Sequence, residues 1–237
     1  MKNDHSFKLV AAVIMMGVFL AMFNVVRAAD AAPKAKKTKT RTGTYQSSNG
    51  NSGTVNSTTT RGQGERTRDS SATNQDGQTA THQSDRKFDK ATGTGTVSSS
   101  STGFNGATTS RQGTLTKNAD GSISGQGTIT GPKGKTSTYS DTTVKTDTGH
   151  STTGTVTGPN GKTGTFDNEV SHTAPGEVTR THTVTGPNGK SGEREVSTKV
   201  NPDGTGTRVI ETTKPDGTTT TRTETFTQTV TPSTPQP

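Results

Sequence analysis

The pattern of apolar and polar positions divides the chain into one apolar run near the N-terminus and a long polar region. In the polar region, β-branched residues recur at every second position, as in Thr179–Thr185 (TRTHTVT) and Thr221–Val230 (TRTETFTQTV). Alternation of period two with Thr and Val is typical of β-strands. No apolar stripe with helical spacing follows the first run. The sequence therefore predicts an all-β protein.

The polar region is repetitive. The heptapeptide VTGPNGK occurs at Val156–Lys162 and at Val184–Lys190, and the near copy ITGPKGK occurs at Ile129–Lys135. Glycine-closed, turn-like clusters recur throughout, and two successive segments form a unit of about 28 residues. The closing glycines are Gly50, Gly64, Gly77, Gly93, Gly106, Gly121, Gly134, Gly149, Gly161, Gly176, Gly189, Gly204 and Gly217.

The residues of these clusters are typical of hairpin turns. In Asn-Pro-Asp-Gly at 201–204, the proline presets φ and the glycine supplies the positive φ of a three-residue loop. The cluster Gly-Pro-Asn-Gly fits the same scheme. The turn residues predicted in this way are Gly134, Gly161, Gly189, Gly204, Gly217, Pro159, Pro187, Pro202 and Pro215.

A register follows if the clusters at 202–204 and 215–217 are loops. Inward apolar residues would then form one narrow cross-strand row, with mostly polar side chains on both faces of the sheet. The predicted pairs are Asn201 with Thr205, Val196 with Ile210, Ile210 with Arg222, and Arg208 with Glu224.

The predicted fold is a repetitive antiparallel β-hairpin meander or a β-solenoid, with little core and partial disorder. Hydrophobic residues make up 21% of the chain and cysteine is absent, so neither a large core nor disulfides would stabilise it. Residues 45–105 are expected to form weakly ordered repeats, residues 106–230 the hairpin repeats, and residues 231–237 a disordered tail.

The N-terminus predicts export. Leu9–Phe23 is an uninterrupted apolar run apart from one glycine, and small residues at Ala28 and Ala29 follow it. This is the arrangement of a secretory signal. Residues 1–28 are therefore expected to be a helical signal segment, with an uncleaved membrane anchor as the alternative, and residues 29–44 a basic flexible leader.

The formal net charge is +8. Its densest positive segment is Pro33–Arg41 (PKAKKTKTR), which suits an anionic polysaccharide or another polyanion, although a solvated leader would have the same composition. No aromatic residues alternate with these cations, so a specific nucleic-acid site is not expected. The candidate polyanion-binding residues are Lys34, Lys36, Lys37, Lys39 and Arg41.

The chain offers few candidates for catalysis. The histidines after the signal lack metal-ligand spacing and are expected to be exposed strand residues. Neither an enzymatic function nor a cofactor is predicted. The Thr-x-Thr pairs, such as Thr155 and Thr157, suggest ice binding as a minor alternative. These four histidines are His82, His150, His172 and His182.

The function predicted from the sequence is that of an exported, non-enzymatic repeat protein, acting as a structural element of the cell surface or extracellular matrix. Self-association through exposed strand edges would suit that role. The alternative is a secreted module that binds anionic polysaccharide or another polyanion.

Overall fold

The structure is a computed structural model that describes residues 36–232. The predicted signal segment, Lys34 and most of the predicted C-terminal tail lie outside the described residues. The described residues form fourteen β-strands and no helix, in agreement with the predicted all-β class.

The strands follow one another with short connections. They are β1 (Lys37–Ser47), β2 (Ser52–Gly62), β3 (Glu65–Asn74), β4 (Thr79–Asp89), β5 (Thr94–Thr102), β6 (Thr108–Lys117), β7 (Ile123–Thr130), β8 (Thr136–Lys145), β9 (Gly149–Thr157), β10 (Thr163–Ala174), β11 (Glu177–Thr185), β12 (Ser191–Val200), β13 (Thr205–Thr213) and β14 (Thr219–Pro232).

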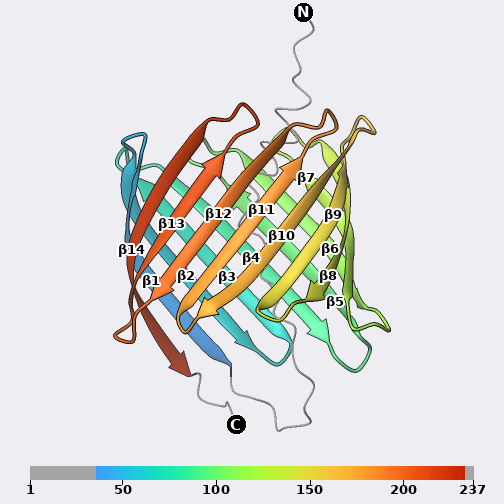
Figure 1. The fold of residues 1–237 in the computed structure, drawn as a ribbon, viewed down its shortest axis with the longest axis horizontal. Coiled ribbons are helices and arrows are strands. Elements are labelled where there is room, and N and C mark those ends of the chain that lie inside the picture. Colours follow the sequence, from blue (N-terminus) through green and yellow to red (C-terminus); the bar gives the residue numbers. More distant parts are fainter. Residues whose placement is uncertain (1–35, 233–237) are drawn as a thin grey trace, which may run out of the picture.

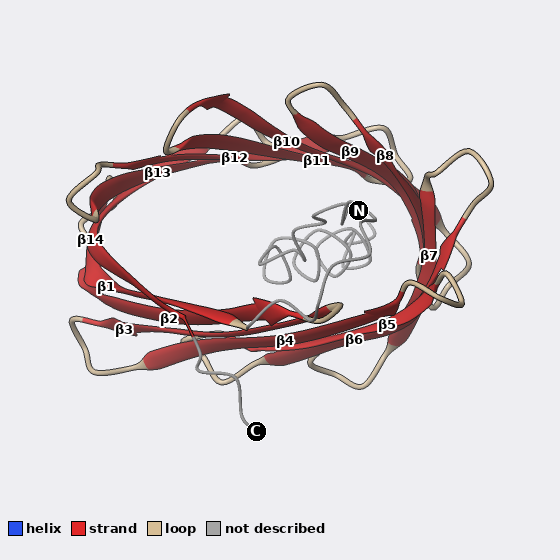
Figure 2. Cartoon of the chain, turned by 90° about the horizontal axis from the view of Figure 1, so that it is seen from below, coloured by secondary structure: helices blue, strands red, loops and turns tan. Residues whose placement is uncertain are grey.

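Each strand pairs with the next in sequence, and β14 pairs with β1, so that the sheet closes into a barrel (Figure 1). The antiparallel meander is thus confirmed, whereas an open sheet or a solenoid is wrong. The seam runs antiparallel from Lys37 opposite Pro232 to Ser47 opposite Arg222. Closure gives the backbone groups of both terminal strands a partner, which no open meander can do. Viewed along its axis, the barrel is flattened (Figure 2).

Two parts of the predicted domain division differ from the structure. Residues 37–44 of the expected flexible leader belong to β1, which has β2 on one side and β14 on the other. Residues 45–105, expected to be weakly ordered, contain β2 to β5 in the same continuous meander. Both segments carry few apolar residues, and backbone pairing with neighbouring strands incorporates them into the sheet.

The glycine-closed clusters are hairpin turns. Of the thirteen closing glycines, all except Gly149 have a positive φ, between 70° and 85°. In the heptapeptide, the Gly158 amide donates to the Lys162 carbonyl at 2.8 Å, and the Gly161 amide donates to the Gly158 carbonyl at 2.9 Å. These bonds enclose a three-residue loop. Gly149 instead begins β9, and the preceding turn is shorter.

Turns that follow odd-numbered strands lie at one end of the barrel, and those that follow even-numbered strands lie at the other. Both copies of Gly-Pro-Asn-Gly and the related Gly-Pro-Lys-Gly follow odd-numbered strands. The repeat of about 28 residues is therefore one hairpin, which returns the chain to the same end of the barrel.

The predicted register is that of the structure. Val196 lies opposite Ile210, Ile210 lies opposite Arg222, and Arg208 lies opposite Glu224. The Asn201 amide donates to the Thr205 carbonyl at 2.8 Å. Turn chemistry alone was sufficient to align these three strands.

The interior is packed by aromatic rings that lie against glycines. Each of five inward aromatic residues pairs with glycine on a neighbouring strand, where the missing side chain leaves room for the ring. Further apolar residues form two clusters, one around Leu115 and one around Phe166. The aromatic pairs are Tyr45 with Gly53, Phe88 with Gly95, Tyr139 with Gly127, Phe166 with Gly154, and Phe226 with Gly43 and Gly206.

Candidate functional site: the arginine-lined interior

The alternation of each strand separates an inner from an outer face. In β10, for example, Phe166, Asn168 and Val170 are buried, whereas Asp167 and Glu169 between them are exposed. The Thr-x-Thr pairs lie on the outer face. Near one barrel end, outer hydroxyls pair across the hairpins, as in Thr157 with Thr163 at 3.0 Å.

Charge is divided between these two faces. All ten arginines of residues 36–232 occupy inward positions, whereas most lysines lie in turns or near strand ends. Asp141 and Glu224 are the inward carboxylates of the described strands, so ten guanidinium groups face two carboxylates. The inward arginines are Arg41, Arg61, Arg66, Arg68, Arg86, Arg111, Arg180, Arg194, Arg208 and Arg222.

The outer wall carries the opposite charge. Its strand residues include ten carboxylates that alternate with inward side chains. The partition places the arginines inside and most carboxylates outside. These outer carboxylates are Glu65, Asp69, Asp85, Asp89, Asp167, Glu169, Glu177, Glu193, Glu195 and Glu211.

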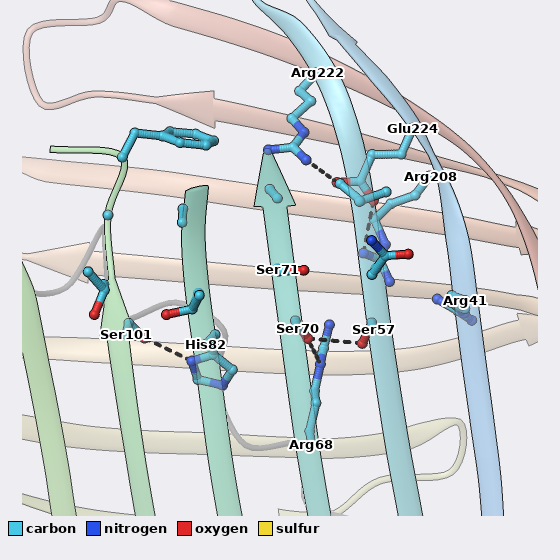
Figure 3. A pocket seen from close by; sticks show the side chains of 18 of the residues that line it. Arg41, Ser57, Arg68, Ser70, Ser71, His82, Ser101, Arg208, Arg222 and Glu224 are labelled. Carbon is cyan, nitrogen blue, oxygen red and sulfur yellow. Dashed lines mark hydrogen bonds and ion pairs between the residues drawn. The ribbon is translucent and has the colours of Figure 1, made fainter. Parts of the chain in front are cut away.

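A cavity of ≈ 200 Å³ lies against the inner face, bordered by β1 to β5 on one side and by β13 and β14 on the other (Figure 3). Its cationic wall contains Arg41, Arg68, Arg208 and Arg222. The rest of the wall combines small hydroxyl and apolar side chains, namely Ser57, Ser70, Ser101, Val55, Ala72, Ala80 and Phe226.

Glu224 is shared by two of the cavity arginines. One carboxylate oxygen accepts from Arg208 Nη1 at 3.0 Å, and the other accepts from Arg222 Nη2 at 2.9 Å. The guanidinium of Arg222 also stacks on the Tyr45 ring, with 3.7 Å from Cζ to the centroid. Arg222 Nε is buried and has no hydrogen-bond partner in the described part of the chain. The carboxylate therefore balances one of these two arginines.

Arg41 also belongs to the cationic wall of this cavity. Its Nε donates to Gln228 Oε1 at 2.9 Å, and its Cζ lies 4.5 Å from the centroid of the Phe226 ring. Stacking on an aromatic face holds a guanidinium in place and leaves its edge available for hydrogen bonds. Burial, followed by repulsion from Arg208, lowers the pKa of Arg41 to about 10.

Mutual repulsion extends across the interior. Burial and the charges of Arg61, Arg180 and Arg86 lower the pKa of Arg66 to about 9. Burial, then Arg41, Arg61 and Arg180, lowers the pKa of Lys39 to about 8. A bound anion would relieve this repulsion, because opposite charge favours the protonated form of each group.

A separate ion pair lies among the apolar clusters. Arg111 Nη2 donates to Asp141 Oδ2 at 3.0 Å, and the guanidinium stacks 3.9 Å from the Tyr139 ring centroid. Burial raises the pKa of Asp141, although Arg111 opposes this effect. This pair has one charge of each sign, unlike the site around Glu224.

The prediction that the strand histidines are exposed is wrong for three of them. His82, His150 and His182 are buried inside the barrel, and only His172 is exposed. His82 Nδ1 lies 2.8 Å from Ser101 Oγ, and His182 contacts Asn168. Burial, followed by neighbouring arginines, lowers the pKa of all three to about 4.

The predicted polyanion-binding residues do not share one surface in the structure. Lys39 and Arg41 face the interior, and Lys37 lies on the same face near the strand end. Lys36 Nζ pairs with Glu65 at 3.0 Å on the surface. The sequence analysis missed the remaining arginines because they are dispersed along the chain. Their signal was that the arginines occupy alternating strand positions, whereas most lysines lie in turns or near strand ends.

The described residues contain no group of three His, Asp or Glu side chains that could hold a metal ion. No helix within residues 36–232 is long and apolar enough to cross a membrane. No family model, curated protein or solved structure matches this chain.

Proposed function

We propose that this protein is an exported, non-enzymatic binding protein that holds an anionic ligand on the arginines inside its barrel. The observation that carries the proposal is the partition of charge within residues 36–232, where ten inward arginines stand against two inward carboxylates. Placing so many like charges on the inner face opposes folding. A ligand that brings negative charge to these arginines would offset that cost.

Arginine rather than lysine suits this role. Its planar guanidinium binds carboxylate, phosphate or sulfate through two parallel hydrogen bonds and stacks on aromatic rings. Three inward arginines stack in this way, on Phe226, Tyr139 and Tyr45. Stacking fixes the orientation of each cation before a ligand arrives.

The sequence also predicted a structural element that assembles through strand edges. In the barrel, β1 and β14 pair with each other, so neither offers its edge to another copy. Binding within the interior therefore has better geometric support than assembly by strand pairing.

The test compares two triple variants that remove the same charge. The interior variant is R61Q/R66Q/R180Q, and the surface variant is K133Q/K162Q/K190Q in turns at one barrel end. Calorimetric titration with alginate, a polyuronate, and with neutral dextran measures binding. We expect alginate alone to bind, added salt to weaken it, and the interior variant to lose at least tenfold in affinity.

An equal loss in the surface variant would place the site on the outside and overturn the proposal. Absence of alginate binding at low salt would contradict it directly.

A further inference from the structure

We infer that the interior takes a linear acidic polysaccharide, which lies along a row of four cations on β1 to β4 and places several consecutive acidic groups on them. This inference rests on the proposed function and adds where the ligand lies and that it is bound as a polymer. It follows from the register of these four strands, the distribution of their charges and the side chains beside the row.

Four cations lie directly opposite one another across four adjacent strands. Lys37 of β1 lies opposite Arg61 of β2. Arg66 of β3 lies opposite Arg61 on one side and opposite Arg86 of β4 on the other. We call these four residues the cation row. Like charges directly opposite each other destabilise a sheet, so anionic groups along the cation row would stabilise the barrel.

The cation row runs from the mouth of the barrel toward its interior. Lys37 is the first residue of β1, whereas Arg86 lies three positions before Asp89, the last residue of β4. Lys37 and Arg61 are exposed, and Arg66 and Arg86 are half-buried. The strands are tilted from the barrel axis (Figure 1), so a row that crosses them changes depth from one strand to the next. An extended polymer can therefore enter along the row with one chain end first.

The positive charge of this wall is concentrated at the same end of the barrel. The next row along the strands contains Lys39 and Arg68, and the third contains Arg41 as its one arginine. The fourth row, from Gly43 to Ala80, contains no cation. The positive field therefore increases toward the mouth, which would draw an anionic polymer to this end.

In β1 to β4, which the structure describes completely, every carboxylate occupies an outward position. Glu65, which precedes Arg66 in sequence, pairs on the outside with Lys36 at 3.0 Å. Arg180 adds a cation from β11, on the opposite wall (Figure 2). Burial, then Arg61 and Arg180, lowers the pKa of Arg66 to about 9. A ligand in this part of the interior would thus lie between cations of both walls.

The spacing and the neighbours of the cation row suit a polyuronate. Neighbouring strands lie about 4.8 Å apart, so at the level of the backbone the row offers cations at intervals close to the length of a six-membered sugar ring. A polyuronate carries one carboxylate on each ring, and guanidinium groups bind carboxylates through paired hydrogen bonds. Thr59 and Ser84 are the next inward residues along the strands from Arg61 and Arg86. Their hydroxyls can exchange hydrogen bonds with sugar hydroxyls.

The experiment is calorimetric titration of the full chain at low ionic strength with mannuronate and with its linear oligomers of two, four and six residues. We expect the tetramer to bind at least tenfold more tightly than the dimer, because each added residue reaches another cation of the row. The hexamer should gain no more than about threefold over the tetramer, since the row contains four cations. Added salt should weaken the tetramer more than the dimer.

Two double variants, each of which removes two inward arginines, separate the cation row from the rest of the interior. R61Q/R66Q should abolish the gain in affinity from dimer to tetramer. R41Q/R194Q leaves the row intact and should keep that gain, although it lowers the affinity of both oligomers. R61K/R66K keeps both charges and should keep most of the gain, which distinguishes a loss of charge from a loss of fold.

The stability of R61Q/R66Q is a second measurement. Because Arg61 and Arg66 lie opposite each other, we expect the Tm of this variant without ligand to be no lower than the wild-type Tm. The tetramer should raise the wild-type Tm by more than it raises the Tm of the variant. A variant Tm well below that of the wild type would show that the row supports the fold instead of a ligand, and would overturn the inference.

The outcomes separate this inference from the proposed function. Alginate binding with equal affinities for the dimer, tetramer and hexamer would overturn the role of the cation row and leave the proposed function standing. Failure of alginate and of every oligomer to bind would overturn both. A gain with length that R61Q/R66Q retains would place the polymer elsewhere. Tighter binding of a linear polyphosphate than of the tetramer would overturn the assignment to an acidic polysaccharide.

Discussion

Glycines on the inner face leave room for the aromatic rings that pack inside the barrel. A Cβ atom added at Gly154 would lie 2.4 Å from Phe166 Cζ and 2.5 Å from the Ser140 carbonyl oxygen. The carbonyl belongs to the backbone and cannot move without breaking strand pairing. The repeated Gly-x-apolar pattern, as in Gly154-Thr155-Val156, therefore has a packing reason as well as a conformational one.

Gly154→Ala tests this packing. We expect the free energy of unfolding to fall by about 1–3 kcal/mol, the usual cost of overpacking a core. Urea unfolding followed by circular dichroism measures the change. Thr153→Ala on the exposed face of the same strand is the control, and it should alter stability by less than about 0.5 kcal/mol. Equal effects of the two substitutions would rule out the ring contact as the cause.

The buried histidines make stability depend on pH. Burial lowers the pKa of His82, His150 and His182 to about 4, whereas an unfolded chain binds the same protons near pH 6.5. The unfolded state therefore takes up more protons between these values, and stability falls as the pH drops from about 6.5 to about 4. Each histidine contributes at most about 1.4 kcal/mol per pH unit.

Chemical unfolding at pH 7, 6, 5 and 4.5 measures this dependence. His182→Gln should make it shallower, because one of the three groups no longer titrates. His172→Gln removes an exposed histidine and should leave the slope as it is in the wild type. A His182→Gln variant with the wild-type slope would show that other groups cause the acid sensitivity.

At the scale of the elements, the turn of VTGPNGK can be tested by one substitution. Gly161 has a φ of +76°, and a Cβ atom there would meet nothing within 4 Å. Gly161→Ala should therefore cost about 1–2 kcal/mol through backbone conformation alone. Gly161→Asn should cost less, since Asn tolerates the left-handed region better. Equal unfolding midpoints for the wild type and the alanine variant would refute the turn assignment.

The elements also show how far the sequence could predict the fold. Pro202 and Gly204 fixed a loop, and the loop fixed the pairing of Val196 with Ile210, because register in a hairpin follows from its turn. The seam between β1 and β14 had no such local signal. Its partners include Arg41 and Gln228, and the positive charge of Lys37–Arg41 indicated a solvated leader.

The candidate site depended on that missing seam. In an open meander both faces of the sheet are exposed to water, so dispersed arginines such as Arg208 and Arg222 would not share an enclosed site. Closure turns one face inward, and every arginine on that face then belongs to a single interior. The sequence could therefore predict that Arg208 lies opposite Glu224, but not that Arg41 would join them.

Closure is thus the property of the whole molecule on which the proposed site depends, and the absence of cysteine allows a clean test. Thr44 on β1 and Thr225 on β14 lie opposite each other on the outer face, with their hydroxyl oxygens 3.3 Å apart. In the variant T44C/T225C, we expect oxidation at low protein concentration to give an intramolecular disulfide. The bond would close a loop of about 180 residues and raise Tm, since long loops lose the most unfolded-state entropy.

The control T44C/T183C combines β1 with β11, which is not a neighbour of β1 in the sheet. It should remain reduced under the same conditions, because two cysteines whose Cα atoms are more than about 7 Å apart cannot be bridged without backbone movement. Mass spectrometry of alkylated protein and non-reducing gels distinguish an internal disulfide, free thiols and disulfide-linked dimers. Intermolecular dimers of T44C/T225C, with no internal disulfide, would indicate free edges at β1 and β14. In that case the arginines would not share one interior, and assembly through strand edges would become the better account of the function.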